Sequence, residues 1–193
     1  MKKFRTWIFI LASAAFLGAA AHSICVFNKA LDGGLAVKMK PEYLSPYRCN
    51  ADFKISMPYK NDLSFVKVKD KKRDYYPGYR EDKHLYVLVC ADENGFLKPL
   101  SYSEKPVKCA ENQALLRLKL NKIKFTDDKG KVLENPEIVF RFSSPSLLAN
   151  GEKVFTELNK KTPYNITVSA KIKDGVVLYE SLVDSGREFL KQR

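Results

Sequence analysis

The first 28 residues constrain this chain most, because a short basic head precedes a long uncharged apolar run. Lys2, Lys3 and Arg5 form the head, and the run from Thr6 to Asn28 is 23 residues long and rich in Ala, Ile, Leu and Phe. A membrane-spanning helix needs about 20 apolar residues, and a secretory signal has the same basic-then-apolar order. The sequence therefore predicts that the rest of the chain is exported.

Two interpretations of this segment stay open at the level of sequence. As a retained signal-anchor, it keeps its basic head in the cytoplasm and makes a single pass through the cytoplasmic membrane, with the domain outside. As a signal peptide, it is cleaved near Ala21 or Ser23, because Ala19-Ala20-Ala21 supplies the small residues that cleavage requires. The exported part is then secreted or periplasmic.

Residues 29–193 have the size and composition of one globular domain. Hydrophobic residues make up 45% of the chain and aromatic residues 12%, which is enough to build a core. Removing the three basic residues of the head leaves 31 basic and 22 acidic residues, a net charge of about +9. Such a surface favours anionic lipid head groups or acidic polysaccharide, or simply keeps the protein soluble. No arginine cluster is interleaved with aromatic residues, so we expect no nucleic-acid partner.

Alternation of apolar and polar residues predicts strands over most of the exported chain. The predicted strands are 35–40, 52–57, 63–69, 85–90, 96–102, 116–125, 138–142, 166–172 and 176–179. One helix is predicted at 150–160, with Asn150 as its cap. We therefore expect a mainly β or α+β fold: a single exported domain of about eight or nine short strands with one helix, behind one N-terminal transmembrane helix.

Turn residues divide these strands. Asn94-Gly95, Asp127–Gly130 and Asp174-Gly175 predict hairpins, and Pro99 predicts an edge strand or a bulge because it cannot donate to a ladder. The charged, tyrosine-rich stretch Asp70–Arg80 is expected to be a loop, either a ligand-binding lip or a surface segment whose tyrosines pack back onto the sheet.

The cysteines and histidines do not form a metal-binding pattern. Cys25, Cys49, Cys90 and Cys109 lack metal-ligand spacing, and only two histidines are present, so we expect no metal and no cofactor. Outside the cytosol, Cys90 and Cys109 are the candidate disulfide, since the bond would close a loop over one hairpin. The alternative is that the exported thiols stay unpaired and buried.

Several segments carry a family resemblance in their order along the chain. Asp52 and Phe53 stand where the family motif has Asp-Tyr, and Tyr59 stands for its final Tyr with one residue inserted; Ala51 replaces the motif glycine. Further similar segments are the strand 85–89, the turn and return strand 94–103, the helix start 150–153 and the strand 166–172. In this order the chain resembles the membrane-anchored bacterial proteins named after their Gly-Asp-Tyr-x-x-Leu-x-Tyr motif, a family without an established activity. The resemblance implies a retained anchor and association with polytopic membrane proteins.

A catalytic constellation is not evident in the sequence. Ser56-Met57 is similar to the nucleophile region of membrane-anchored Ser/Lys signal peptidases, but such a serine needs a desolvated lysine, and no particular lysine is indicated. We therefore expect a non-enzymatic envelope protein that binds or regulates an integral membrane partner. An exported module that binds anionic polymer or lipid head groups is the alternative, and a Ser/Lys hydrolase at Ser56 is a remote one.

Overall fold

The computed structural model describes residues 2–45, 50–66, 73–77, 83–143, 166–184 and 187–191. These residues form one long apolar helix followed by antiparallel strands in two sheets, which confirms the predicted mainly β fold behind an N-terminal helix. The helix predicted at 150–160 lies outside the described residues.

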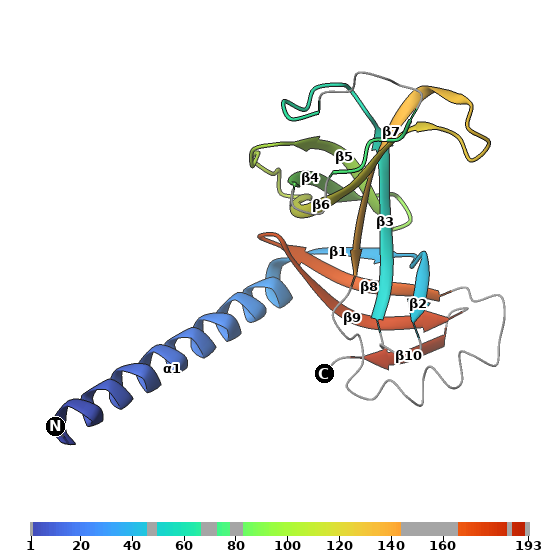
Figure 1. The fold of residues 1–193 in the computed structure, drawn as a ribbon. Coiled ribbons are helices and arrows are strands. Elements are labelled where there is room, and N and C mark those ends of the chain that lie inside the picture. The colour runs from blue at the N-terminus through green and yellow to red at the C-terminus, as the bar shows by residue number, and fades with distance from the viewer. Residues whose placement is uncertain are drawn as a thin grey trace.

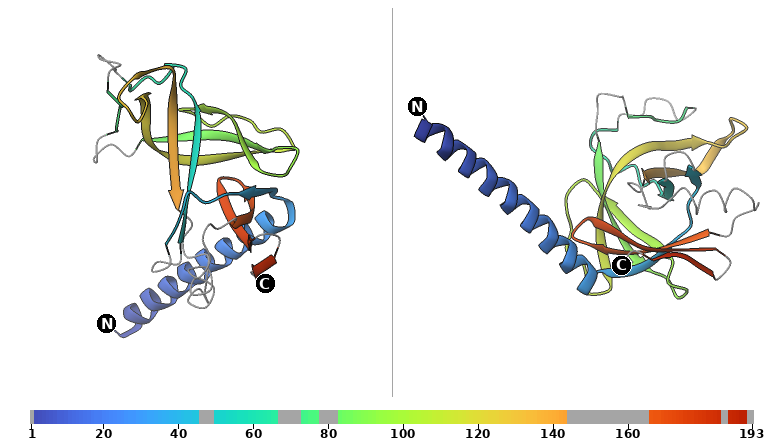
Figure 2. Two further views of the ribbon diagram at one scale, coloured as in Figure 1. Left: turned by 90° about the vertical axis from the view of Figure 1, so that its right-hand side faces the viewer. Right: turned by 90° about the horizontal axis from the view of Figure 1, so that it is seen from below.

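Helix α1 (Lys2–Gly33) projects away from the β domain, and views at right angles agree on this arrangement (Figures 1 and 2). It continues five residues beyond the predicted boundary at residue 28 and takes in Asp32 and Gly33, although the Asp-Gly-Gly sequence at 32–34 is typical of a turn. Two consecutive glycines, Gly33 and Gly34, stand where it ends, in keeping with the low helix propensity of glycine. The helix therefore leads directly into the first strand.

The two sheets have four and six strands within the described residues. In the first, the order is β1 (Leu35–Met39), β8 (Ile166–Lys173), β9 (Val176–Asp184) and β10 (Arg187–Lys191). In the second, it is β2 (Tyr43–Ser45), β3 (Asn50–Pro58), β7 (Val132–Ser143), β6 (Gln113–Thr126), β4 (His84–Ala91) and β5 (Leu97–Ser103). Each sheet thus contains strands that are distant in sequence.

Three segments differ from their predicted structure. Strand β2 falls between Pro41 and Pro46, and β10 falls near the C-terminus, two stretches in which no strand is predicted from the sequence. Both segments are strands because their backbones pair with a neighbouring strand, β2 with β3 and β10 with β9. Residues 63–66 of the predicted strand 63–69 form a turn, in which the Val66 amide donates to the Leu63 carbonyl at 3.2 Å; the rest of that strand lies outside the described residues. Leu63 is nevertheless buried, so its apolar character reflects packing rather than a strand.

Strand β6 changes partner at a bulge. Its first half pairs with β4 and its second half with β7. A register shift between Leu120 and Lys122 inserts Asn121, so even-numbered residues up to Leu120 and odd-numbered residues from Ile123 all face the core. An inserted residue moves the pattern by one position and bends the strand, which lets one strand serve two parts of the sheet.

The hairpin and bulge predictions are confirmed where the structure describes them. Strand β5 is an edge strand, and its pairing with β4 shifts register beside Pro99. Asp92 and Asp127 begin two similar turns, in which one carboxylate oxygen accepts the amides two and four residues later. Gly95 and Gly130 close these turns with φ near 80°, a conformation that glycine adopts at little cost.

Phe53 connects the two sheets through the core. Its ring stacks on Phe142 of the neighbouring strand at 5.2 Å and on Tyr179 of the other sheet at 5.9 Å, and the residue is only 2% exposed. Offset aromatic pairs add to the stability gained by burying their area. Phe53 is therefore a packing residue of the sheet interface.

Residues 73–77 attach to the second half of β6. The backbone of Tyr75 exchanges two hydrogen bonds with Ile123, at 2.9 and 2.8 Å, and its side chain packs against the core. Tyr76 is 61% exposed and has the Lys122 ammonium 5.6 Å from its ring centre. Tyr75 thus follows the second prediction, that tyrosines of this segment pack back onto the sheet, and Tyr79 lies outside the described residues.

Asp74 holds this segment in place. Its Oδ1 accepts hydrogen bonds from the amides of Phe125 and Thr126 and from the Thr126 hydroxyl, and its Oδ2 accepts one from Lys122, all at 3.0–3.1 Å. Partial burial acts to raise the pKa of Asp74, but these hydrogen bonds outweigh it and the pKa is lowered from 3.8. The ionised carboxylate therefore stabilises the fold.

We predict that Phe53→Ala lowers the free energy of unfolding by roughly 3–5 kcal/mol, because it leaves a cavity between the sheets. Val132→Ala is the control, since Val132 is 50% exposed and its truncation should cost less than about 1 kcal/mol. Urea unfolding of the full chain in non-ionic detergent measures both. Equal losses for the two variants would contradict the packing role of Phe53.

We predict that Asp74→Ala costs about 1–3 kcal/mol at pH 7, because two backbone amides lose their acceptor. The lowered pKa means that the carboxylate stabilises the fold above its unfolded pKa of about 3.9. That contribution is lost as the pH falls through the folded-state pKa. The difference between wild type and variant, measured by urea unfolding, should therefore shrink below about pH 4. A constant difference between pH 7 and pH 3 would contradict this account.

Candidate functional site

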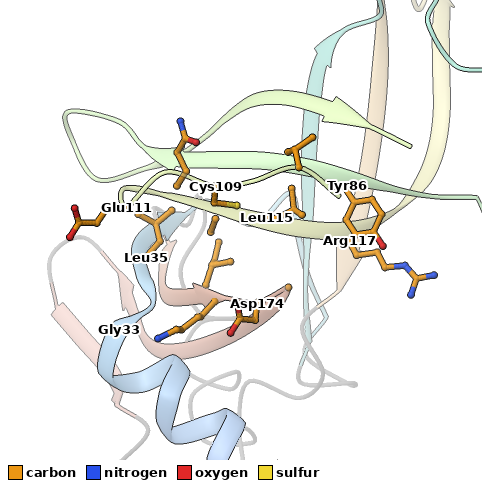
Figure 3. Close-up of a pocket in the computed structure, with 14 residues that line it drawn as sticks. Gly33, Leu35, Tyr86, Cys109, Glu111, Leu115, Arg117 and Asp174 are labelled. Carbon is orange, nitrogen blue, oxygen red and sulfur yellow. The ribbon is translucent and has the colours of Figure 1, made fainter. Parts of the chain in front are cut away.

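A cleft of about 560 Å³ lies where α1 meets the β domain (Figure 3). Its walls are the end of α1 at Gly33, the turn between β8 and β9, the neighbouring parts of β4 and β6, and the connection between β5 and β6 around Val107–Glu111. This volume falls in the range of ligand-binding pockets. The cleft is therefore the candidate functional site.

The turn between β8 and β9 forms one wall because its two central residues adopt left-handed backbone conformations. Asp174 has φ 51° and Gly175 has φ 80°, the pattern of a two-residue hairpin turn whose twist matches the strands. A Cβ placed on Gly175 would lie 3.9 Å from the Leu115 carbonyl oxygen of β6. The first sheet thus reaches the second at this turn.

Lys173 connects the same turn to the helix. Its ammonium lies so near Gly33 that a Cβ placed there would come within 2.8 Å of it. The carbonyl end of a helix carries partial negative charge, which a cation stabilises. Within the described residues the last turn of α1 has no basic residue of its own, so Lys173 supplies this charge from β8.

The cleft combines charged residues of both signs with apolar ones. Tyr86 and Arg117 are paired in register between β4 and β6 and lie together at one end, while Glu111 lies at the other (Figure 3). Counting Lys173 and Asp174, the lining has two cations and two carboxylates. Leu35, Val107 and Leu115 add apolar surface. A balanced, partly apolar surface of this kind suits a protein segment better than a polyanion.

The motif-like residues predicted from sequence do not line this cleft. Phe53 is buried between the sheets as described above, and Asp52 stands in β3 between Tyr43 and Ser143. Tyr59 is 9% exposed, meets the ring of Phe125 edge-on at 5.8 Å, and donates its hydroxyl to Asn61 at 3.3 Å. Burial raises the pKa of Tyr59, with a smaller contribution from Asp62. Phe53 and Tyr59 therefore serve the core.

The cysteines of the candidate disulfide are free in the structure. Cys90 lies in β4 opposite Gln113 of β6, and Cys109 is exposed in the connection that precedes β6. The bond between Cys90 and Cys109 is not formed in the structure, and this pairing stays a prediction. Cys49 lies outside the described residues.

Ser56 lies on the exposed side of β3, opposite Val139 of β7. The lysine two residues before it on the same side, Lys54, is 41% exposed and lies 3.9 Å from the carboxylate of Glu42. A lysine that acts as a general base has to be desolvated to lower its pKa. The surroundings of Ser56 therefore do not favour the hydrolase hypothesis.

Comparison with protein-family models, curated proteins and solved structures finds no match to this chain. The resemblance to the Gly-Asp-Tyr-x-x-Leu-x-Tyr proteins thus stays a prediction. The cleft residues were missed from sequence because they come from four separate segments of the chain, and neither Arg117 nor Glu111 belongs to a local motif. The one available signal was the Asp174-Gly175 turn, which marked a hairpin tip but not its neighbours.

Proposed function

We propose that this protein is a membrane-anchored envelope protein with a binding or regulatory role and no catalytic one. In this proposal α1 stays in the cytoplasmic membrane, the β domain lies outside, and the cleft binds an exposed segment of an integral membrane partner. The observation that carries the proposal is the uncovered apolar surface of α1.

The segment Trp7–Cys25 has the length and character of a membrane span. It contains 19 residues with a mean hydropathy of 1.9, and none of it is buried against the domain. At 1.5 Å per residue it is about 29 Å long, close to the ~30 Å hydrocarbon core of a bilayer. Its large exposed residues include Trp7, Phe9, Leu11, Phe16 and Leu17. Covering each such side chain gains about 1.5–3 kcal/mol, so a bilayer would stabilise this helix strongly.

The junction with the domain favours an anchor over a cleaved signal. The helix runs on past Ala21 and Ser23 without a break and ends against Lys173. The eight residues from Val26 to Gly33 add about 12 Å beyond the apolar segment. With Trp7–Cys25 in the bilayer, the cleft would lie close to the membrane surface, where the exposed segments of an integral membrane protein are within reach.

A photo-cross-linking experiment tests the proposed partner contact. A photoreactive residue at Val107, which is 42% exposed in the cleft wall, should form an adduct with a polytopic membrane protein in intact cells. Val132 is the matched position, since it is 50% exposed but follows the far end of β6, and it should not form that adduct.

The charge-swapped variant Glu111→Lys/Arg117→Glu completes the experiment by keeping the net charge unchanged. It should reduce the Val107 adduct several-fold, because close charge pairs at an interface fix its register. Equal adducts from Val107 and Val132, or an adduct that ignores the charge swap, would contradict the cleft as the binding site. Release of the intact protein by a carbonate wash would contradict the anchor.

A further inference from the structure

A second hollow, a groove of about 210 Å³, lies between β1, β3, β7 and the turn that joins β4 to β5. Three of the nine residues that line it are lysines, namely Lys38, Lys40 and Lys54, and none of the nine is acidic. Aromatic side chains, among them Phe96 and Phe142, supply apolar surface between the lysines. This groove is separate in composition and position from the neutral cleft at the helix.

Two of these lysines lie in and directly after β1. Val37 and Met39 are buried in the core, so Lys38 projects from the other side of the strand, and the exposed Lys40 follows the strand directly. The turn between β4 and β5 contacts both lysines. The Lys38 amide donates to the Gly95 carbonyl at 2.7 Å, its ammonium lies 3.3 Å from the Asn94 carbonyl, and the Lys40 ammonium lies 5.4 Å from the centre of the Phe96 ring.

The positive charge of the third lysine, Lys54, is only partly neutralised by its acidic neighbour. Lys54 has the Glu42 carboxylate at 3.9 Å, but Glu42 also contacts Arg141 at 3.1 Å, the shorter of the two distances. The groove and its edge carry four cations and one carboxylate, namely Lys38, Lys40, Lys54, Arg141 and Glu42. The local charge is therefore about +3. The surface is therefore complementary to an anion rather than to a neutral peptide.

We propose that this groove binds an anionic polysaccharide, with the lysines pairing to carboxylate or phosphate groups and Phe96 contacting the apolar side of a sugar ring. An exposed lysine–anion pair contributes about 0–1 kcal/mol, so one sugar binds weakly. In a polymer with a charge on every repeat, a neighbouring repeat can bind as soon as one dissociates, which raises the apparent affinity.

The position of the groove favours a polysaccharide over lipid head groups. Strand β1 leads away from the end of α1 (Figure 1); Lys38 lies near its far end, and Lys40 directly follows it. The cleft residues around Gly33, not these lysines, lie next to the helix. Every residue that would contact the polymer belongs to the β domain, whereas the preference for a polysaccharide over lipid head groups rests on the proposed retention of α1 in the membrane.

Fluorescence anisotropy with labelled polygalacturonate oligosaccharides tests the proposal, using the full chain in non-ionic detergent. The variant Lys38→Glu/Lys40→Glu should bind about tenfold more weakly, the effect expected from losing two contacts of roughly 0.7 kcal/mol each. The matched control is Lys129→Glu/Lys131→Glu, which changes the net charge equally at an exposed turn. It should weaken binding less than about twofold, and neutral dextran should not bind.

Two further arms identify the anion and separate the groove from a general charge effect. Phosphorylated dextran in place of polygalacturonate shows whether phosphate or carboxylate is preferred, and a tenfold loss in the Lys38/Lys40 variant for either polymer supports the groove. Equal losses in the two double variants would overturn it, because they indicate attraction by net charge alone. If the Lys38/Lys40 variant lost binding to anionic lipid vesicles but kept its polysaccharide binding, that result would also overturn the proposal, in favour of a lipid surface.

Discussion

The structure depends on one constraint, the apolar surface of α1, which nothing in the described part of the chain covers. Helices that are apolar on all sides are stable inside a membrane or a large core, and the β domain provides no such core for α1, since the segment Trp7–Cys25 is entirely unburied. The domain has its own core between two sheets, centred on residues such as Phe53 and Phe140. Helix and domain therefore satisfy their hydrophobic surfaces separately, and they meet over a short junction at Gly33.

That junction links α1 to the candidate site. Lys173 places its charge at the carbonyl end of the helix, and the adjacent Asp174-Gly175 turn contacts β6. The same few residues thus lie at the end of the helix and form one wall of the cleft. In the proposed function, a partner bound in the cleft would also touch the domain end of α1, so that binding and membrane position would be physically connected. The lysine groove at the far end of β1 offers a second surface of different chemistry.

Local sequence patterns predicted the elements that depend on local physics. Alternating residues identified β4 and β8, the glycine-containing turns identified their hairpins, and Pro99 identified an irregular edge strand. The short strand β2 escaped prediction because pairing with β3, not its own composition, makes it a strand. The site was not predictable for a related reason. Lys173 of the first sheet lines the same cleft as Glu111 and Arg117 only because the two sheets pack together. Phe53, which stood out as a motif residue, has a structural explanation in the core.

The most direct test of a retained anchor is the intact mass of the protein purified from the membranes of cells that express the 193-residue sequence without a tag. The account predicts a chain of about 22.0 kDa that still contains residues 1–25. A mature chain that begins immediately after Ala21 or Ser23 would contradict it, because the apolar segment on which the account rests would then be a signal removed during export.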